Sequence, residues 1–467
     1  MNDLRTKFSR AYKVEDRVAP PLTSSFAPEP LRTQLPVGAG PTLGMLFATY
    51  CSCLIDRQIF NIIAEPIRKD LDLQDWQIGL LGGLAFSLFY AVLGLGFGRW
   101  ADRSTTDRPV LIAQCLALWS AMTMICALPV NFVQFALARF GVGVGEAGCS
   151  PAAHSLIADI VPLEHRAFAM GLYSLATPTA KLVGLGLGGV IAQLYGWRAA
   201  FLIVGAPGLL LAIICRLWLP EPRRWRSEPA FDRVSVSLWT AIVQLARIRS
   251  YRLITLGAAL MTFLSLGEAT FLAAFAIRTY HLSVAEAGLS LGLILGLGGA
   301  VGGWLGGWLS DRLGRRDLRA YGVLPAITGL GGGGTLILAM LASRLELALA
   351  YLAVSSALNS VWYGPAFSTL QGLAPPKMRA TASAFSLLVC NLIGMGLGPV
   401  CIGLMSDQYS RGFSIGNWVV PGLGIAHGLQ ASLIVAAFVV IPAAACFLAA
   451  ARQLPAELRA AGSWRPG

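Results

Sequence analysis

Long apolar segments alternate with short polar or charged breaks along most of the chain. Most segments match the roughly 20 apolar residues that a helix needs to cross a bilayer. The pattern therefore predicts an all-α membrane protein with twelve spanning helices, at residues 41–64, 76–101, 109–128, 132–158, 166–194, 198–219, 251–279, 284–310, 320–343, 347–371, 378–407 and 426–451.

Polar stretches divide these helices into two groups of six. Residues 41–219 hold the first half and residues 251–451 the second, with a cytoplasmic linker at 220–250 between them. Residues 1–40 are polar and proline-rich and lack the apolar core of a signal peptide, so we expect a disordered cytoplasmic tail. Residues 452–467 are expected to form a second cytoplasmic tail.

The composition agrees with a multi-spanning membrane protein. Of the 467 residues, 55% are hydrophobic and only 13% are charged, whereas soluble domains carry about 25% charged residues. The net charge of +12 arises in the loops, which argues against a nucleic-acid partner. The nine cysteines show no metal-binding spacing. No P-loop, zinc motif or nucleophile elbow is present, so we expect no metal, no cofactor and no enzyme activity.

The distribution of basic residues predicts the orientation. With the N-terminus inside, most of the 36 lysines and arginines fall in the tails and the inner loops. The predicted outer loops hold only Arg68, Lys69, Arg198, Arg278, Arg344 and Arg411. Because basic loops stay in the cytoplasm, both termini are expected there.

The two halves repeat one another in sequence. "GRWADR" at 98–103 returns as "GWLSDRLGRR" at 307–316, and "GLGLG" at 184–188 returns as "GMGLG" at 394–398. "PAAHSLIADIVPLEHRA" from Pro151 likewise resembles "PAFSTLQGLAPPKMRA" from Pro365. The nearly constant offset predicts two pseudo-symmetric six-helix halves around a central cavity.

These motifs resemble the major facilitator superfamily, whose signature loop G-x-x-x-D-R-x-G-R-R is matched in full at 307–316. The first copy departs from the signature after 98–103. "RFGVGVGEA" in the fourth span also resembles a motif of the superfamily. The resemblance implies a cytoplasmic conformational latch, which closes that side in the outward-open state and is formed by Gly98, Asp102, Arg103, Gly307, Asp311, Arg312 and Arg315.

The first and fourth spans carry charges inside the membrane, namely Asp56, Arg57, Arg139 and Glu146. An isolated charge at the bilayer centre costs roughly 2.5–3.5 kcal/mol, so each should face a partner or a wet cavity. The pattern allows either Asp56 with Arg139 or Arg57 with Glu146. An Asp-Arg pair in span one and a glutamate that closes the span-four motif resemble the spinster branch, which moves lysolipids and sphingosine phosphates in animals.

We predict that Asp56 and Glu146 carry protons, and that Arg57 and Arg139 bind substrate or switch partners. The alternative is that all four form static pairs that fix helix packing. Further candidates for substrate binding or switching lie in later spans. Each of them also has a structural alternative such as snorkelling, packing or membrane anchoring. These candidates are Lys181, Glu268, Asn359, Trp362, Tyr363 and Asn391.

Together these features predict a proton-coupled secondary active transporter that works by alternating access. The expected cargo is an anionic, amphipathic, lysolipid-like molecule, exported by proton antiport. The alternatives are an organic-anion/proton symporter, a uniporter, or a transport-inactive membrane receptor or scaffold. The expected setting is a bacterial inner membrane, with the protein as a monomer whose partners are lipids, protons and the cargo.

Overall fold

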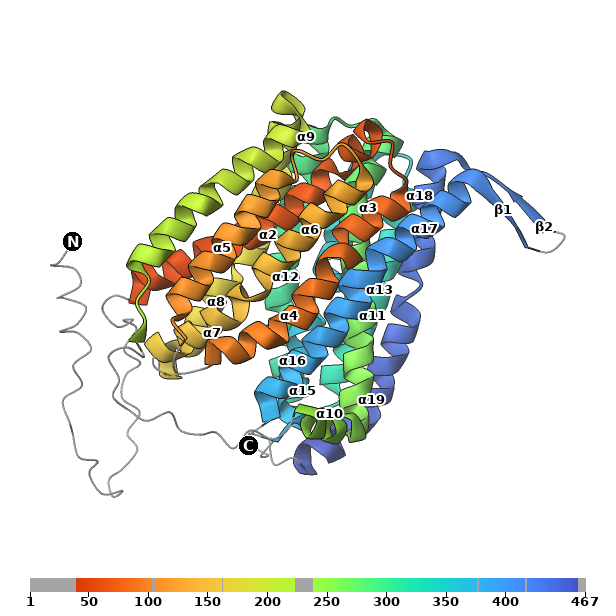
Figure 1. Cartoon of the computed structure of the whole chain (residues 1–467). Helices are drawn as coiled ribbons and strands as arrows, with labels where there is room; N and C mark the ends of the chain where they lie inside the picture. Colours follow the sequence, from red (N-terminus) through yellow and green to blue (C-terminus); the bar gives the residue numbers. More distant parts are fainter. Residues whose placement is uncertain are drawn as a thin grey trace, which may run out of the picture.

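The structure is a computed structural model that describes residues 39–102, 106–161, 163–222, 238–375, 378–415 and 418–460. In these residues the chain forms one inclined bundle of long helices (Figure 1). The predicted helical fold is confirmed, with one small addition. Strands β1 (Gly412–Ile415) and β2 (Trp418–Pro421) pair as an antiparallel hairpin that projects from one end of the bundle.

Within the described residues the first half contains eight helices, because three of the six predicted spans consist of two helices each and two neighbouring spans share one helix. They are α2 (Ala39–Asp70), α3 (Asp75–Gly82), α4 (Leu84–Asp102), α5 (Arg108–Ile125), α6 (Phe132–Ala147), α7 (Cys149–Ile160), α8 (Leu163–Ser174) and α9 (Ala176–Trp218). The long α9 covers most of spans five and six. It is broken at Gly196, whose φ of 84° favours glycine.

The second half begins after the linker helix α10 (Leu238–Arg247). Its helices are α11 (Arg249–Tyr280), α12 (Val284–Gly314), α13 (Ala320–Leu341), α14 (Leu345–Ser360), α15 (Tyr363–Leu373), α16 (Arg379–Val389), α17 (Gly398–Arg411), α18 (Gly424–Ala437) and α19 (Val440–Ala460). A π-helical segment, η3 (Cys390–Leu397), joins α16 to α17. Such segments inside helices often mark functional positions.

Local sequence signals set several helix starts. The Asp107 side chain accepts a hydrogen bond from the backbone N–H of Val110 at the start of α5. Asn131 caps α6 in the same way, and Ser283 opens α12 with a reciprocal capping box to Glu286. These side chains satisfy backbone N–H groups that have no partner within the helix.

The helices are consistent with twelve membrane crossings. Within the described residues, nine stretches are long and apolar enough to span a membrane. One of these, Phe168–Trp218, contains two predicted spans. The other two predicted spans are α2 and the pair α6–α7, which carry the four intramembrane charges.

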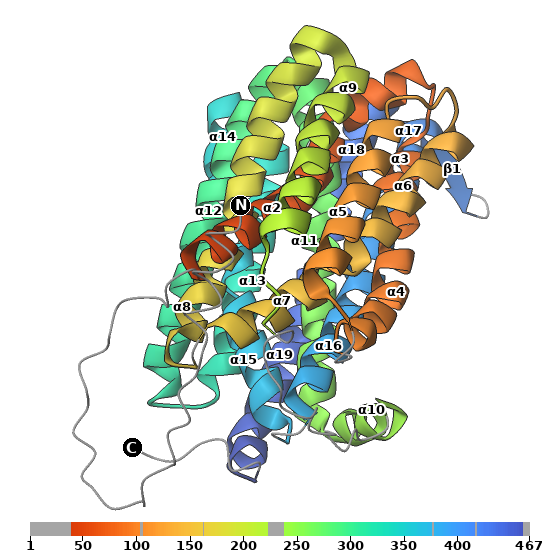
Figure 2. The same cartoon turned by 60° about the vertical axis from the view of Figure 1, so that its left-hand side comes forward.

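The two halves meet closely along α9 and α12, which run side by side (Figure 2). Glycines permit this contact: a Cβ on Gly189 would lie 2.6 Å from the carbonyl oxygen of Val284. A Cβ on Gly288 would in turn meet the carbonyl oxygen of Leu185. The interface therefore brings backbone against backbone, as small residues do in membrane helix packing.

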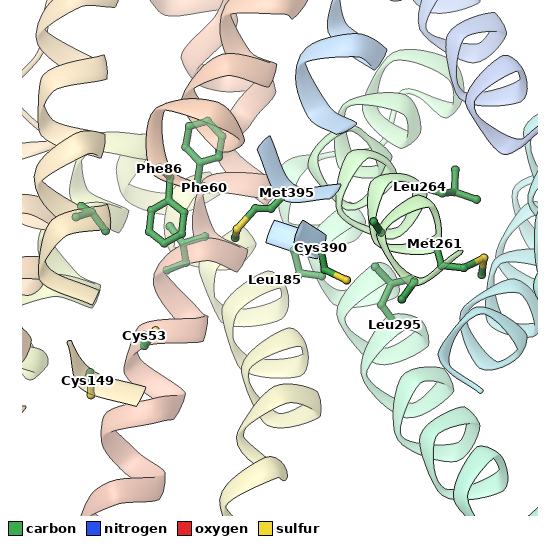
Figure 3. Close-up of a cluster of buried hydrophobic side chains, with 14 of the residues drawn as sticks. Cys53, Phe60, Phe86, Cys149, Leu185, Met261, Leu264, Leu295, Cys390 and Met395 are labelled. Carbon is green, nitrogen blue, oxygen red and sulfur yellow. The ribbon is translucent and has the colours of Figure 1, made fainter. Parts of the chain in front are cut away.

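We call the end of the bundle that holds the hairpin the outer end, and the end that holds α10 the inner end (Figure 1). Near the bundle centre, buried side chains from both halves lie close together, among them Phe60, Phe86, Leu185 and Met395 (Figure 3). A Cβ on Gly83 of the α3–α4 junction would lie 2.8 Å from the carbonyl oxygen of Met395 in η3. The middle of the molecule is thus an interface between the halves.

Candidate functional site

Arg57 of α2 pairs with Glu146 of α6 inside the first half. Its Nε and Nη2 atoms donate hydrogen bonds to Oε2 of Glu146, at 3.0 Å and 2.6 Å. The side chain of Glu146 is fully buried, whereas 20% of the Arg57 side chain is exposed. Of the two pairings that the sequence allowed, this is the one that the structure forms. Arg57 is thus the accessible member of the pair, and it covers the buried Glu146 carboxylate.

Aromatic and thiol groups surround this pair. The guanidinium carbon of Arg57 lies 4.6 Å from the ring centroid of Phe86 and 4.9 Å from that of Tyr90. The Cys53 thiol donates to Oε2 of Glu146 at 3.0 Å, so one oxygen receives all these bonds. The other oxygen, Oε1, has no hydrogen-bond partner among the described residues. An acceptor position on the carboxylate is therefore open to a proton or a polar group.

Asp56 faces a different helix from its neighbour. Its Oδ2 accepts a hydrogen bond of 2.8 Å from the hydroxyl of Thr123 on α5. Only 2% of Asp56 is exposed, and its Oδ1 has no hydrogen-bond partner in the described part of the chain. Adjacent residues on a helix point about 100° apart, which explains why Asp56 meets α5 while Arg57 meets α6.

Arg139 lies on α6, the helix that also carries Glu146, and aromatic rings surround its guanidinium. Its guanidinium carbon is 4.7 Å from the ring centroid of Phe60 and 5.6 Å from that of Phe86, and its Nε donates to the carbonyl of Leu81 at 3.3 Å. Arg139 interacts electrostatically with both Asp56 and Glu146, and only 2% of it is exposed. The four side chains therefore lie in one connected group whose formal charges sum to zero.

Two further intramembrane charges lie in opposite halves of the bundle. Lys181 of α9 and Glu268 of α11 interact electrostatically and lie near the middle of their spans. A Cβ on Gly299 would lie 3.5 Å from Nζ of Lys181 and 3.6 Å from Oγ of Ser360. Glu268 is 7% exposed, and its Oε2 has no hydrogen-bond partner within the residues described. Lys181 thus approaches α12, and Glu268 keeps an unsatisfied acceptor.

The remaining candidates occupy different surroundings. Asn359 and Trp362 are 6% exposed each, and Nδ2 of Asn359 donates to Ser355 at 3.2 Å. Tyr363 is 55% exposed, with its ring 5.5 Å from that of Trp362, and Asn391 is partly exposed in η3. Asn359 therefore packs within its own half, and Tyr363 is the most accessible of the four.

The signature loop of the second half is exposed at the inner end. Asp311, Arg312 and Arg315 are all exposed, and a Cβ on Gly307 would meet nothing within 4 Å. The guanidinium carbon of Arg312 lies 5.4 Å from the ring centroid of Trp308. In this conformation the loop is accessible, and its latch role stays a prediction.

The first copy of the loop is described in part. Gly98 and Asp102 lie at the C-terminal end of α4, which ends at Asp102. Arg103 lies outside the described residues. The latch role of the first copy likewise stays a prediction.

Sequence reasoning missed a charged network at the outer end. Arg278 of α11 bridges Glu65 of α2 and Asp75 of α3, at 2.6 Å to each. The sequence placed these residues in or beside outer loops, where charges are normally solvated. A signal was nevertheless present, because two acids and two arginines cluster at the ends of three spans that the duplication brings together.

The sequence matches the model of the Major Facilitator Superfamily over residues 46–399. An MFS-type efflux pump of Mycolicibacterium smegmatis is 33% identical over 419 residues, which cover 89% of this chain and 94% of the pump. The chain belongs to the Major Facilitator Superfamily. Among its other relatives, protein spinster homolog 1 of Bos taurus is 29% identical, over 87% of this chain and 79% of that protein.

Solved structures place this superfamily member near the spinster branch. A bacterial homolog of the human lysosomal transporter spinster, in an inward-facing and unoccupied conformation, superposes with a TM-score of 0.81. It is 29% identical, and the match covers 92% of this chain and 99% of that one. The occupied inward-facing form gives a TM-score of 0.79. The predicted transporter fold and the spinster resemblance are confirmed.

Proposed function

We propose that this superfamily member is a proton-coupled secondary active transporter that exports an anionic, amphipathic, lysolipid-like cargo by proton antiport. The observation that carries the proton coupling in this proposal is the Arg57–Glu146 pair, a fully buried carboxylate held by a partly exposed guanidinium. A carboxylate next to arginine favours its charged form, and it takes up a proton more readily when the two separate. Conformational change and protonation are thereby linked.

In this proposal the acids in the membrane carry protons and the arginines bind the cargo. When Glu146 takes up a proton, it no longer needs Arg57, which can then bind an anionic group of the cargo. Asp56, held by Thr123 and by the field of Arg139, is a second proton carrier. Both arginines lie over aromatic rings that also suit an apolar tail. Lys181, Glu268 and the span-ten residues would extend the binding surface into the second half.

The direction of coupling distinguishes two candidate functions. Export is supported by the 33% identity to a protein named an efflux pump. Symport of an organic anion with a proton is supported by the pair itself. A proton on Glu146 frees Arg57 for an anion, so the two ligands favour binding together. Antiport requires instead that cargo binding displaces the proton of Asp56.

Proteoliposomes containing the full-length protein and an internal pH dye test the proposal. Cargo is first sought by thermal shift with a panel of lysolipids and small organic acids. A hit should then move in response to an imposed pH gradient, with proton flow opposite to cargo for antiport and parallel to it for symport. Asp56→Asn and Glu146→Gln should abolish gradient-driven movement. Asp72→Asn, at an exposed turn position with φ of 48° that asparagine tolerates, is the matched control.

Two results would contradict the assignment. If both neutral variants keep gradient-driven transport, Asp56 and Glu146 do not carry the protons. If the wild type binds ligands of the panel but moves none of them, a transport-inactive receptor becomes the better description.

A further inference from the structure

Charged side chains from both halves meet at the outer end of the bundle. Arg278 of α11 donates from Nη1 and Nη2 to the two carboxylate oxygens of Asp75 on α3, at 2.7 Å and 2.6 Å. Its Nε and Nη2 also donate to Oε2 of Glu65 on α2, at 2.8 Å and 2.6 Å. One guanidinium of the second half thus binds two carboxylates of the first, with the paired geometry that makes such contacts strong.

A second set of hydrogen bonds joins the two halves, and here the carboxylate belongs to the second half and the donors to the first. Asp407 of α17, in the second half, accepts hydrogen bonds from the backbone N–H groups of Asp75 and Trp76, at 3.1 Å and 2.8 Å. Ser406 donates to Oδ2 of Asp75 at 2.6 Å. A carboxylate of the second half therefore caps α3, where the helix dipole favours a negative charge.

The network follows the pseudo-symmetry of the two halves. Helices α2 and α11 end at Asp70 and Tyr280, which are 210 positions apart. The same offset relates Arg68 to Arg278, since 278 − 68 = 210. Arg68 also binds Glu65, at 3.0 Å, and lies 3.9 Å from Asp75. Two equivalent arginines therefore share the same two carboxylates.

These charges are removed from water in the closed outer end. The side chains of Glu65, Asp75 and Arg278 are 2%, 3% and 6% exposed. The contact between the halves gives the two buried acids a second arginine, and that arginine is lost when the halves separate. If Arg278 moved away with its half, Glu65 and Asp75 would keep only Arg68 and the exposed Lys69, whose Nζ lies 3.8 Å from Oε1 of Glu65, and would need water.

We propose that Arg278 is the positioning residue of an outer gate. The outer gate consists of Glu65, Arg68, Asp75 and Arg278, and it closes the outer side of the bundle. In each transport cycle Arg278 must release the two carboxylates. Neither proton coupling nor a particular cargo is needed for this role, so the inference goes beyond the proposed function. It requires only that the halves separate at the outer end.

The gate can be tested by measuring a distance across the outer end. Spin labels are placed at Val130→Cys in the first half and Ser343→Cys in the second, both exposed positions in outer loops. The partly exposed Cys401 and Cys446 are replaced by serine, because the other seven cysteines are buried. Pulsed electron resonance on the full chain in proteoliposomes then reports how often the outer ends separate.

Arg278→Gln should raise the ratio of long to short distances by about tenfold or more, since the closed state then holds unpaired buried carboxylates. Arg278→Lys keeps the positive charge but cannot make the paired hydrogen bonds of the guanidinium, so it should give an intermediate ratio of long to short distances. Arg198→Gln is the matched control. It removes an exposed ion pair to Asp70 within the first half and should leave the distribution unchanged.

The proposal is overturned if Arg278→Gln and Glu65→Gln both show the wild-type distribution. It is also overturned if Arg198→Gln opens the outer end as much as Arg278→Gln does. Should Arg278→Gln fail to fold, Glu65→Gln decides alone, because it removes one carboxylate and leaves the paired contact between Arg278 and Asp75 in place.

Discussion

The Nη2 atom of Arg57 lies 2.6 Å from Oε2 of Glu146, and this contact joins the first span to the fourth deep in the membrane. The acid is fully buried and the base is not. Any group that competes for Arg57 must therefore leave Glu146 either protonated or unpaired. The stability of the protein should consequently report on this pair even when no cargo is known.

Arg57→Ala should lower the free energy of unfolding by about 3–5 kcal/mol at pH 8, because it leaves the Glu146 carboxylate buried without its partner. The double variant Arg57→Ala with Glu146→Gln should recover most of this loss. Thermal and denaturant unfolding in detergent measures both. A double variant no more stable than Arg57→Ala would show that the pair does not carry the effect.

The penalty of Arg57→Ala should shrink when the pH falls from 8 to 5, because a proton can neutralise the stranded Glu146. Arg198→Gln provides the control for this series. Asp70 lies beyond the predicted first span, and the hydrogen bond from Arg198 holds the pKa of its carboxyl below the ordinary value. The ionised Asp70 stabilises the fold above its unfolded pKa of about 3.9, and this contribution is lost only in stronger acid. The stability penalty of Arg198→Gln should therefore be the same at pH 8 and pH 5.

Asp56→Asn should abolish proton-driven accumulation but keep the fold, because the amide oxygen of asparagine can still accept the hydrogen bond from Thr123. Thr123→Val should have the opposite effect, lowering stability while keeping proton-driven accumulation. It removes one donor and should cost about 1–3 kcal/mol of stability while the proton site remains. Flux and unfolding are measured on the same preparations, and equal flux defects in the two variants would contradict a proton role for Asp56.

Gly189→Val should weaken the contact between the halves, because a Cβ there would lie 2.6 Å from the carbonyl oxygen of Val284. We expect a loss of about 1–3 kcal/mol, the usual cost of overpacking. Gly303→Val on α12 is the control, since a Cβ at that position would meet nothing within 4 Å. Similar losses for both variants would assign the effect to helix propensity rather than to the interface.

Lys181→Met and Glu268→Gln should show coupled rather than additive effects on stability, with an interaction term of about 0.5–3 kcal/mol. The two charges act on each other across the halves, and removing either one leaves the other in a poorly solvated place. A double-mutant cycle by thermal unfolding measures the term. Strict additivity would mean that the two residues act independently in this conformation.

The sequence predicted the helices well because hydropathy reports directly on the length of chain that crosses a membrane. The seventh span, predicted at 251–279, is the helix Arg249–Tyr280. Periodicity could not reveal the π-helical turn at Cys390–Leu397, because its extra residue depends on packing against α11 and α4. The hairpin at 412–421 was missed for a related reason, since it is too short to form a clear alternating pattern.

The site was predicted in its residues but only partly in its contacts. Asp56 and Arg57 stood out because charges inside apolar segments are costly. Hydropathy cannot show which neighbouring helix each side chain faces, so the contact of Asp56 with Thr123 came only from the fold. Arg278 went unnoticed because a charge at the end of a span costs little until the second half places it against Glu65.

The outer gate also has a kinetic consequence. If the empty carrier spends most of its time closed outside, cargo on that side meets a competent site for only a small fraction of the time. Its apparent affinity from outside is then reduced by that fraction, although its contacts in the site are the same. Initial rates measured from the two faces of the membrane should therefore differ, and weakening the contact between Arg278 and Glu65 should make them more alike.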